Sequence, residues 1–325
     1  MTVDVTCAFA TQLATPDHIV VAEKLGYTRA WCYDSPALYP DVWVQLCRAA
    51  ERTSTIGLGP GVLIPSLRHP MTTAAAIATL VDAAGASRVQ VGVGTGFTGR
   101  FTLGKKPLKW AYVKEYVEVV QALLRGDVTT WDGAKIQMIH PGMCAPDRPI
   151  NVAWVIGAAG PKGYAVAKEL GAGLFLGGAA PEPGRGRQIL LHFGTVLDVG
   201  ESPNSDRVID AAGHGAAVYF HFFHENGLGV EKLPGGAQWL AAYQDVPDDV
   251  KHLAIHDLHL IGVSERDRPL ITGDLITAMG GCYSPARLRE MLAEWETNGV
   301  TEIGYQPAGP DIPRELEAFM NAARG

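Results

Sequence analysis

The sequence of 325 residues has few cysteines and only a small excess of charge of one sign. Its five cysteines, Cys7, Cys32, Cys47, Cys144 and Cys282, are odd in number and never form a CxxC pair. This disfavours both a disulfide framework and a thiolate metal site. Lys and Arg number 27 against 34 Asp and Glu, and no basic run is present, which argues against a nucleic acid as partner.

Long apolar runs are also missing. No segment reaches the ~20 apolar residues needed to cross a bilayer, and the first ten residues lack a basic region followed by an apolar stretch. The sequence therefore predicts a soluble protein with no membrane partner in a reducing cytoplasm. Hydrophobic residues make up 47% and charged residues 19%, with 38 glycines and 21 prolines, a composition typical of a compact enzyme with many tight turns.

Short apolar strands alternate with helical segments along most of the chain, as in parallel βα units. The predicted strands are 3–9, 30–33, 56–63, 89–93, 150–156, 174–176, 189–197 and 301–306, and the predicted helices are 17–25, 41–52, 71–83, 110–124, 162–170 and 285–297. Eight such units in a chain of this length favour an α/β fold of the (β/α)8 or TIM-barrel type over an open sheet. Asp132-Gly133, inside residues 128–138, predicts an external hairpin.

Residues 206–281 do not fit one βα repeat, because the segment is too long and mostly helical. We interpret it as a helical insertion over the carboxyl-terminal face of the barrel, within a single domain spanning residues 1–325. One helix is predicted to carry His214, His221 and His224, and another His252, His256 and His259. His252 and His256 have a spacing found in metal sites, but no glutamate completes HExxH, so no metal is predicted.

Two further segments of this insertion have a simple interpretation. The aromatic run Tyr219, Phe220, Phe222 and Phe223 is interpreted mainly as core. The run Glu265-Arg266-Asp267-Arg268 is interpreted as a solvated charge cluster.

The most informative stretch is a strand that runs into a glycine cluster, residues 87–100 (SRVQVGVGTGFTGR). Glycine permits positive φ and a close approach to bare backbone amides, so a cofactor pocket is predicted here. Residues 94–99 spell GxGxxG, but Gly104 and Pro107 interrupt the residues that follow, and no helical pattern begins before Trp110. This argues against a dinucleotide site.

Glycine-rich segments also follow other predicted strands, at residues 59–65, 157–161 and 177–178. Functional residues of a βα barrel lie at the carboxyl ends of its strands, so these rims are predicted to cradle a large ligand. The run 157–161 precedes a helix whose free amides suit a phosphate. The alternative is that these loops are glycine-rich only because barrel loops commonly are.

These segments resemble the bacterial luciferase-like superfamily. The resemblance lies in residues 58–70 (LGPGVLIPSLRHP) with the helix after them, 87–96, 132–133 and 159–162 (AGPK). It covers residues 1–180 well and 284–310 more loosely. It implies a TIM barrel that binds FMN or the deazaflavin coenzyme F420. Residues 92–96 and the Gly-Pro-Lys turn are more similar to the deazaflavin branch, which includes glucose-6-phosphate dehydrogenases and methylenetetrahydromethanopterin reductases.

The resemblance also implies site residues. A non-prolyl cis peptide is expected at Gly61-Val62. Residues expected to bind the cofactor are Asp34, Gly61, Val62, Ile64, Thr95 and Gly96 around the ring or its ribityl arm, Ala159, Gly160, Lys162 and Gly163 near the phosphate and tail, and Gly177 on the last glycine rim. The alternative for Lys162 is a solvated lysine in the first turn of a helix.

The sequence departs from the sugar-phosphate dehydrogenases of this superfamily at their acid and base. Where they carry a histidine and a glutamate, this chain has Ser35 and Phe97. A phenyl ring has no proton to exchange, and a serine hydroxyl is a weak acid unless activated, so that activity is not expected. The candidates for catalysis are Asp34 and Ser35 and, from the insertion, His221 and His256.

We therefore expect a flavin- or deazaflavin-dependent oxidoreductase that transfers a hydride between coenzyme F420 and a small organic substrate, which the protein orients and shields from water. One alternative is an FMN-dependent luciferase-like monooxygenase, which needs oxygen and a flavin reductase as partner. A second is a non-catalytic flavin-binding protein. A homodimer is expected by analogy with the superfamily.

Overall fold

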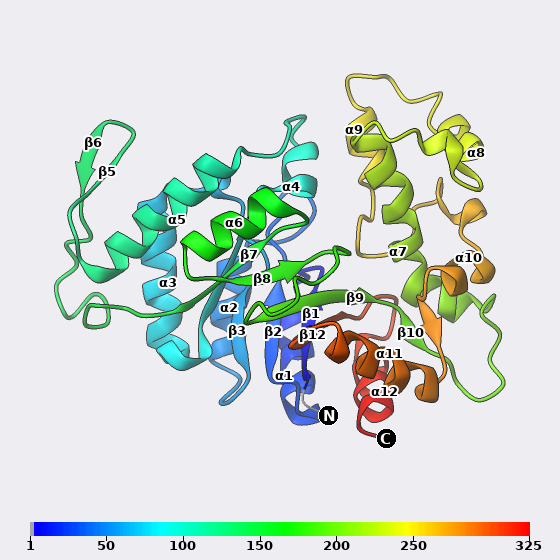
Figure 1. Ribbon diagram of the computed structural model, residues 1–325, viewed down its shortest axis with the longest axis horizontal. Coiled ribbons are helices and arrows are strands. Elements are labelled where there is room, and N and C mark those ends of the chain that lie inside the picture. The colour runs from blue at the N-terminus through cyan, green and yellow to red at the C-terminus, as the bar shows by residue number, and fades with distance from the viewer. Residues whose placement is uncertain (1–2) are drawn as a thin grey trace.

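A computed structural model describes residues 3–325 and has a parallel barrel at its centre (Figure 1). Within these residues, eight strands pair in the order β3-β2-β1-β12-β9-β8-β7-β4, and all of these pairs are parallel. Bridges from Leu58 to Val89 and from Leu63 to Val93 join β3 to β4 and close the ring. The circular order follows the chain order, as in a TIM barrel, which confirms the predicted fold. Residues 1 and 2 of the predicted domain lie outside the described part.

The barrel elements agree with most of the predicted ranges. The strands are β1 (Asp4–Phe9), β2 (Arg29–Cys32), β3 (Gly57–Pro60), β4 (Gln90–Gly94), β7 (Ala153–Gly157), β8 (Gly173–Leu176), β9 (Gln188–Phe193) and β12 (Glu302–Gln306). The helices around them are α1 (Thr15–Leu25), α2 (Val42–Ala50), α3 (Pro70–Ala84), α5 (Trp110–Arg125), α6 (Pro161–Glu169), α11 (Pro285–Thr297) and α12 (Ile312–Arg324). Short 3-10 turns occur at η1 (Pro65–Leu67), η2 (Ala86–Arg88), η3 (Val230–Lys232) and η4 (Arg268–Leu270).

Local signals in the sequence set several of these ends. The Asp41 carboxylate accepts hydrogen bonds from the amides of Trp43 and Val44 and begins α2. Gly26 and Gly126, at φ of 83° and 88°, end α1 and α5. The predicted hairpin is confirmed as β5 (Thr129–Trp131) and β6 (Ala134–Ile136), which project from the barrel (Figure 1).

Two predicted strands were wrong in extent, and one helix was not predicted. The strand predicted at 56–63 ends at Pro60, because the chain then leaves the sheet as a bulge. The strand predicted at 189–197 divides at Gly194, φ 145°, into β9 and β10 (Thr195–Val196), which pairs with β11 (Cys282–Tyr283). A five-residue helix, α4 (Phe97–Phe101), follows the glycine cluster where no helix was predicted before Trp110.

The amino-terminal end of the barrel is plugged by a buried ionic cluster. Glu302, which is 2% exposed, accepts hydrogen bonds from the indole of Trp31 (3.1 Å) and from the guanidinium groups of Arg29 (3.4 Å) and Arg187 (3.1 Å to Nε). These residues fill the barrel interior below the strand ends. They close the amino-terminal end of the barrel, opposite the mouth formed by the carboxyl ends of the strands.

The insertion is helical, as predicted, and gathers beside the barrel next to β9 and β10 (Figure 1). Its helices are α7 (Asp206–Glu225), α8 (Gly236–Ala242), α9 (Lys251–Ile255) and α10 (Gly273–Ala278). None of the described helices is long and apolar enough to cross a membrane.

One prediction for the insertion is confirmed and one is wrong. His214, His221 and His224 share α7. The three other histidines do not share a helix: α9 ends at Ile255, His256 is its C-cap, and His259 lies in the turn that follows. Leu258 and Leu260 adopt φ of 53° and 62°, which a right-handed helix does not allow.

Candidate active site

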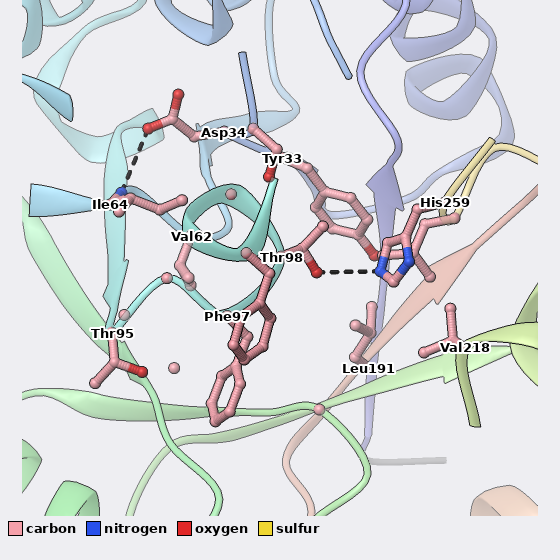
Figure 2. Close-up of a pocket in the computed structure, with 18 of the residues that line it drawn as sticks. Tyr33, Asp34, Val62, Ile64, Thr95, Phe97, Thr98, Leu191, Val218 and His259 are labelled. Carbon is pink, nitrogen blue, oxygen red and sulfur yellow. Dashed lines mark hydrogen bonds between the residues drawn. The ribbon is translucent and has the colours of Figure 1, made fainter. Parts of the chain in front are cut away.

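The chain leaves β3 as a bulge that enters the barrel mouth. The peptide between Gly61 and Val62 is cis, which confirms the expectation from the resemblance. The Leu63 amide donates to the Gly92 carbonyl (2.8 Å), and the Gly94 amide donates to the Leu63 carbonyl (3.0 Å). The bulge therefore stays attached to β4, and Val62 lies over the barrel interior as part of the pocket wall (Figure 2).

The glycines of β4 and β7 make room for Val62. A Cβ at Gly92 would lie 2.7 Å from the Pro60 carbonyl oxygen, and one at Gly94 only 2.8 Å from Val62 Cγ2. At Gly157 the distance to the same methyl carbon would be 3.2 Å. The glycine pattern thus predicted the place of the pocket correctly, but these glycines admit a side chain of the protein instead of exposing amides to a ligand.

Gly96 and Gly177 show the two roles that glycine takes at this mouth. Gly96 has φ 80°, and a Cβ there would lie 2.6 Å from Ile64 Cγ2, so it accommodates the bulge. Gly177 is exposed at the end of β8, and a Cβ there would meet no atom within 4 Å. Bare backbone therefore faces open space at Gly177.

A cavity of about 320 Å³ lies at this mouth, at the lower end of the ~300–1,000 Å³ usual for ligand pockets. Its walls come from the carboxyl ends of barrel strands and, opposite them, from α7 and the turn after α9. The structure brings together eleven of the predicted site residues here: Asp34, Ser35, Gly61, Val62, Ile64, Thr95, Gly96, Ala159, Gly177, His221 and His256.

Gly160, Lys162 and Gly163 lie outside the cavity wall, at the start of α6. Lys162 is exposed in the first turn. A Cβ at Gly163 would lie 2.5 Å from Ala158 Cβ and 2.6 Å from the Trp110 ring, so this glycine packs α6 against its neighbours. Ala159 lies between the cavity and this helix start, and the roles of Gly160 and Lys162 toward a phosphate stay predictions.

Asp34 is buried at the end of β2 and paired. Its Oδ2 accepts a hydrogen bond from Arg68 (2.7 Å) and a long one from the Ile64 amide (3.4 Å; Figure 2). Arg68 also binds Asp41 at 2.9 Å. Burial raises the pKa of Asp34, and the Arg68 guanidinium opposes that rise. Asp34 therefore anchors the bulge as well as lining the cavity, and Ser35 lies beside it as a buried wall residue.

The insertion contributes a hydrogen-bonded network to the opposite wall. His221 Nδ1 lies 3.0 Å from His259 Nδ1, and His221 Nε2 lies 3.1 Å from Asp267 Oδ2. His259 Nε2 lies 3.1 Å from the Thr98 hydroxyl (Figure 2). The sequence did not single out Thr98, His259 or Asp267 for this site. Asp267 is 1% exposed, so the interpretation of residues 265–268 as a solvated run was wrong at this position.

Burial decides the charge of this wall. It lowers the pKa of His259 well below its ordinary value and that of His256 to about 4. Burial raises the pKa of Glu225 on α7, whose carboxylate lies 3.9 Å from His256 Nδ1. Burial alone would raise the pKa of Asp267, but hydrogen bonds from His221 and its other donors bring it below its ordinary value. The wall thus holds the neutral imidazoles of His256 and His259 and the buried carboxylate of Asp267.

The rest of the cavity is largely apolar. The apolar side chains of its outer part are Phe97, Phe101, Leu191, Phe193, Val218, Phe222 and Leu260. Phe220 is core, as predicted, but Phe222 lines the cavity and Tyr219 is exposed. Among the described lining residues there is no Lys or Arg, and the carboxylates are Asp34 and Glu225. The cavity therefore favours an uncharged ligand surface.

Residues 13–191 match the luciferase-like monooxygenase family. The protein belongs to this family. It is 26% identical over 320 residues to the 5,10-methylenetetrahydromethanopterin reductase of Archaeoglobus fulgidus, with 92% of this chain and 91% of that protein covered. It is 30% identical over 210 residues to the F420-dependent glucose-6-phosphate dehydrogenase of Beutenbergia cavernae, covering 56% and 57%.

The fold has a close counterpart among solved structures. The F420-dependent tetrahydromethanopterin reductase of Methanopyrus kandleri superimposes with a TM-score of 0.68, at 21% identity, with 100% of this chain and 99% of that chain covered. The aligned part includes the insertion as well as the barrel.

Proposed function

We propose that this protein is an oxidoreductase that transfers a hydride between coenzyme F420 and a small, uncharged, mainly apolar substrate. The observation that carries the proposal is the bulge of residues 61–64, which presents Val62 and Ile64 at the floor of a cavity that opens at the barrel mouth. F420 dependence is named for the Beutenbergia cavernae relative and for the Methanopyrus kandleri reductase, and it supports the choice of cofactor.

The residues present fit a deazaflavin. A flat ring needs apolar support on one face and free space at its edge, and Val62 and Ile64 offer the first. Gly177, with open space at its Cβ position, offers the second. Beyond Ala159, the amides at the start of α6 and the exposed Lys162 suit an anionic tail.

Bound there, the deazaflavin supplies a ring carbon that accepts or gives a hydride. Val62 would support one face of the ring and leave the other face, toward Phe97 and the insertion, to a substrate. Asp34, held by Arg68, fixes the bulge. The aromatic rings of Phe101 and Phe222 line the cavity on that side and would shield a bound substrate from solvent.

The lining also restricts the substrate. A phosphate ester needs cationic partners, whereas the described lining residues include no Lys or Arg and do include two carboxylates, Asp34 and Glu225. Ser35 and Phe97 stand where the sugar-phosphate dehydrogenases carry their acid and base. We therefore propose an apolar, uncharged substrate in place of a sugar phosphate.

The test is a fluorescence titration of the purified protein with coenzyme F420 and, separately, with FMN. Micromolar or tighter binding of F420 alone supports the proposal, and preference for FMN would indicate the monooxygenase alternative. Tight binding with no turnover of any substrate would indicate a flavin-binding protein.

A matched pair of variants makes the site assignment specific. Gly177→Val adds bulk where nothing lies within 4 Å, so the fold tolerates it, but the ring edge loses its space. Gly142→Val is the control, since Gly142 also has open space around it and lies outside the cavity. We expect only Gly177→Val to abolish F420 binding; equal binding by both variants would contradict the placement of the ring.

A further inference from the structure

Four side chains form a continuous hydrogen-bonded series from the insertion to the cavity. In order they are Asp267, His221, His259 and Thr98, with neighbouring polar atoms 3.1, 3.0 and 3.1 Å apart. Thr98, His259 and His221 line the cavity. Figure 2 shows the Thr98 hydroxyl directed at the ring of His259.

Asp267 fixes the direction of the series. Its Oδ1 accepts hydrogen bonds from the Trp239 indole (2.8 Å) and the Tyr243 hydroxyl (3.0 Å), and its Oδ2 accepts one from the Ser264 hydroxyl (2.9 Å). An ionised carboxylate only accepts. His221 must therefore donate to it through Nε2.

The remaining donors follow from that assignment. The relay starts with a single ring proton on His221, at Nε2, so that His221 accepts at Nδ1 and His259 donates through its own Nδ1. His259 Nε2 is then an acceptor, and the Thr98 hydroxyl donates to it. The oxygen of Thr98 keeps its acceptor positions, since no other hydrogen bond of this side chain occurs within the described residues.

Resting on the proposed function, we propose that Thr98 exchanges a proton with a hydroxyl or carbonyl oxygen of the substrate, and that His259 and His221 relay this proton to the side of Asp267. The relay takes the place of the acid and base that Ser35 and Phe97 do not supply. Thr98 is adjacent to Phe97, so the replacement lies at the same rim of the barrel but draws on the insertion.

The steps balance for the oxidation of an alcohol. The substrate C–H bond breaks, and its hydrogen leaves as hydride with both electrons to the deazaflavin, the oxidant. The alcohol O–H proton passes to the Thr98 oxygen, the proton of Thr98 to His259 Nε2, and the Nδ1 proton of His259 to His221 Nδ1. The products are a ketone, the reduced deazaflavin and a His221 imidazolium beside the Asp267 carboxylate. Reduction of a ketone follows the same steps in reverse.

The Asp267 carboxylate lies 3.1 Å from the ring that receives the proton at the end of the relay. The titratable groups that face the relay are His214, His224 and Glu225 on α7, His256 after α9, and Tyr243 after α8. Burial lowers the pKa values of His214 and His256 to about 4, so both are neutral near pH 7. Asp267 is therefore the charged group in contact with a protonated His221.

The first test needs neither cofactor nor substrate. Long-range 1H–15N NMR correlations of the protein labelled with 15N-histidine report which ring nitrogen carries the proton, with signals assigned through the variants His221→Gln and His259→Gln. We expect the Nε2–H form for His221 and the Nδ1–H form for His259 near pH 7.5. Thr98→Val should shift the Nε2 signal of His259. A proton on Nε2 of His259 would overturn the relay.

The second test compares three variants of α4 in the protein loaded with coenzyme F420. Thr98→Val removes the hydroxyl at nearly constant shape, and Thr98→Ser keeps it. Thr102→Val is the matched control, because the Thr102 hydroxyl is buried at the end of the same helix with no partner among the described residues. The assay is anaerobic reduction of F420 by 2-butanol, cyclohexanol and 1-phenylethanol, with F420 affinity measured in parallel.

We expect Thr98→Val to lower kcat by about 10²–10⁴-fold, the usual contribution of a positioned acid or base, with F420 affinity unchanged. Thr98→Ser should retain most of the activity, and Thr102→Val all of it. An unchanged kcat in Thr98→Val overturns the relay. Tight F420 binding without reduction by any alcohol also overturns it and leaves the proposed function standing. Absence of F420 binding overturns the proposed function itself.

Discussion

Replacing Asp267 by asparagine tests how much the buried carboxylate stabilises the insertion. Asp267 joins α7, α8 and the segment before η4 through four hydrogen bonds, from His221, Ser264, Trp239 and Tyr243. Hydrogen bonds to a charged group contribute about 1.5–3 kcal/mol and neutral ones about 0.5–1.5 kcal/mol. Losing roughly 1 kcal/mol at each of four bonds gives about 4 kcal/mol, within the ~3–5 kcal/mol typical of breaking a buried pair.

The orientation of the new amide sharpens this prediction. The Trp239 indole only donates, so the amide oxygen must stay toward Trp239, and the amide nitrogen then faces His221. His221 must accept at Nε2 and carry its proton on Nδ1, opposite the Nδ1 proton of His259. In Asp267→Asn we therefore expect the ring proton of His221 to move from Nε2 to Nδ1 and that of His259 from Nδ1 to Nε2. Both changes are visible in the histidine NMR spectrum.

Urea unfolding measures the stability change. Asp245→Asn is the control, because the Asp245 carboxylate is exposed where it binds Arg266, and such surface pairs contribute about 0–1 kcal/mol. A free energy of unfolding for Asp267→Asn that equals that of Asp245→Asn would refute the reasoning.

Two further predictions concern packing and pH. Gly94→Ala should destabilise the protein by about 1–3 kcal/mol through its contact with Val62, and Val62→Ala should relieve that cost in the double variant; additive effects on urea unfolding would contradict the contact. Burial lowers the pKa of His192 to about 3 and those of His214 and His256 to about 4. Because these values lie below the ordinary value of about 6.5, the histidines stabilise the fold fully above pH 6.5. This stability is lost as the pH falls toward 4, by up to about 1.4 kcal/mol per pH unit for each group; unfolding free energies that are equal at pH 7 and pH 4.5 would contradict it.

Most of the barrel could be predicted because its signals are local. Buried parallel strands are short apolar runs, and the helices between them begin at residues such as Asp41 and end at glycines such as Gly26 and Gly126. The elements that the sequence did not predict depend on contacts distant in the chain. The short α4 was hidden by the glycines around it. After α9 the chain turns with Leu258 and Leu260 at positive φ, and this turn holds His259 between His221 and Thr98.

The candidate site divides in the same way. The strand-end residues could be predicted, because a barrel brings the carboxyl ends of its strands to one face. Asp267 could not, since its neighbours Arg266 and Arg268 are charged and form exposed ion pairs. Its side chain is held inward by Ser264 close by in the chain and by the distant partners His221, Trp239 and Tyr243.

The proposed site divides two tasks, cofactor binding and proton transfer, between the barrel and the insertion. The bulge at Val62 and the glycines around it belong to the barrel and shape the floor on which the cofactor is proposed to lie. The proposed relay begins at the rim with Thr98 but continues through His259, His221 and Asp267, which all belong to the insertion. Changes in the insertion can therefore alter proton transfer without disturbing the cofactor floor. It follows that His259→Gln should lower kcat and leave the affinity for coenzyme F420 unchanged, whereas Gly177→Val should abolish that affinity; a joint loss of both properties in His259→Gln would show that the two tasks are not separate.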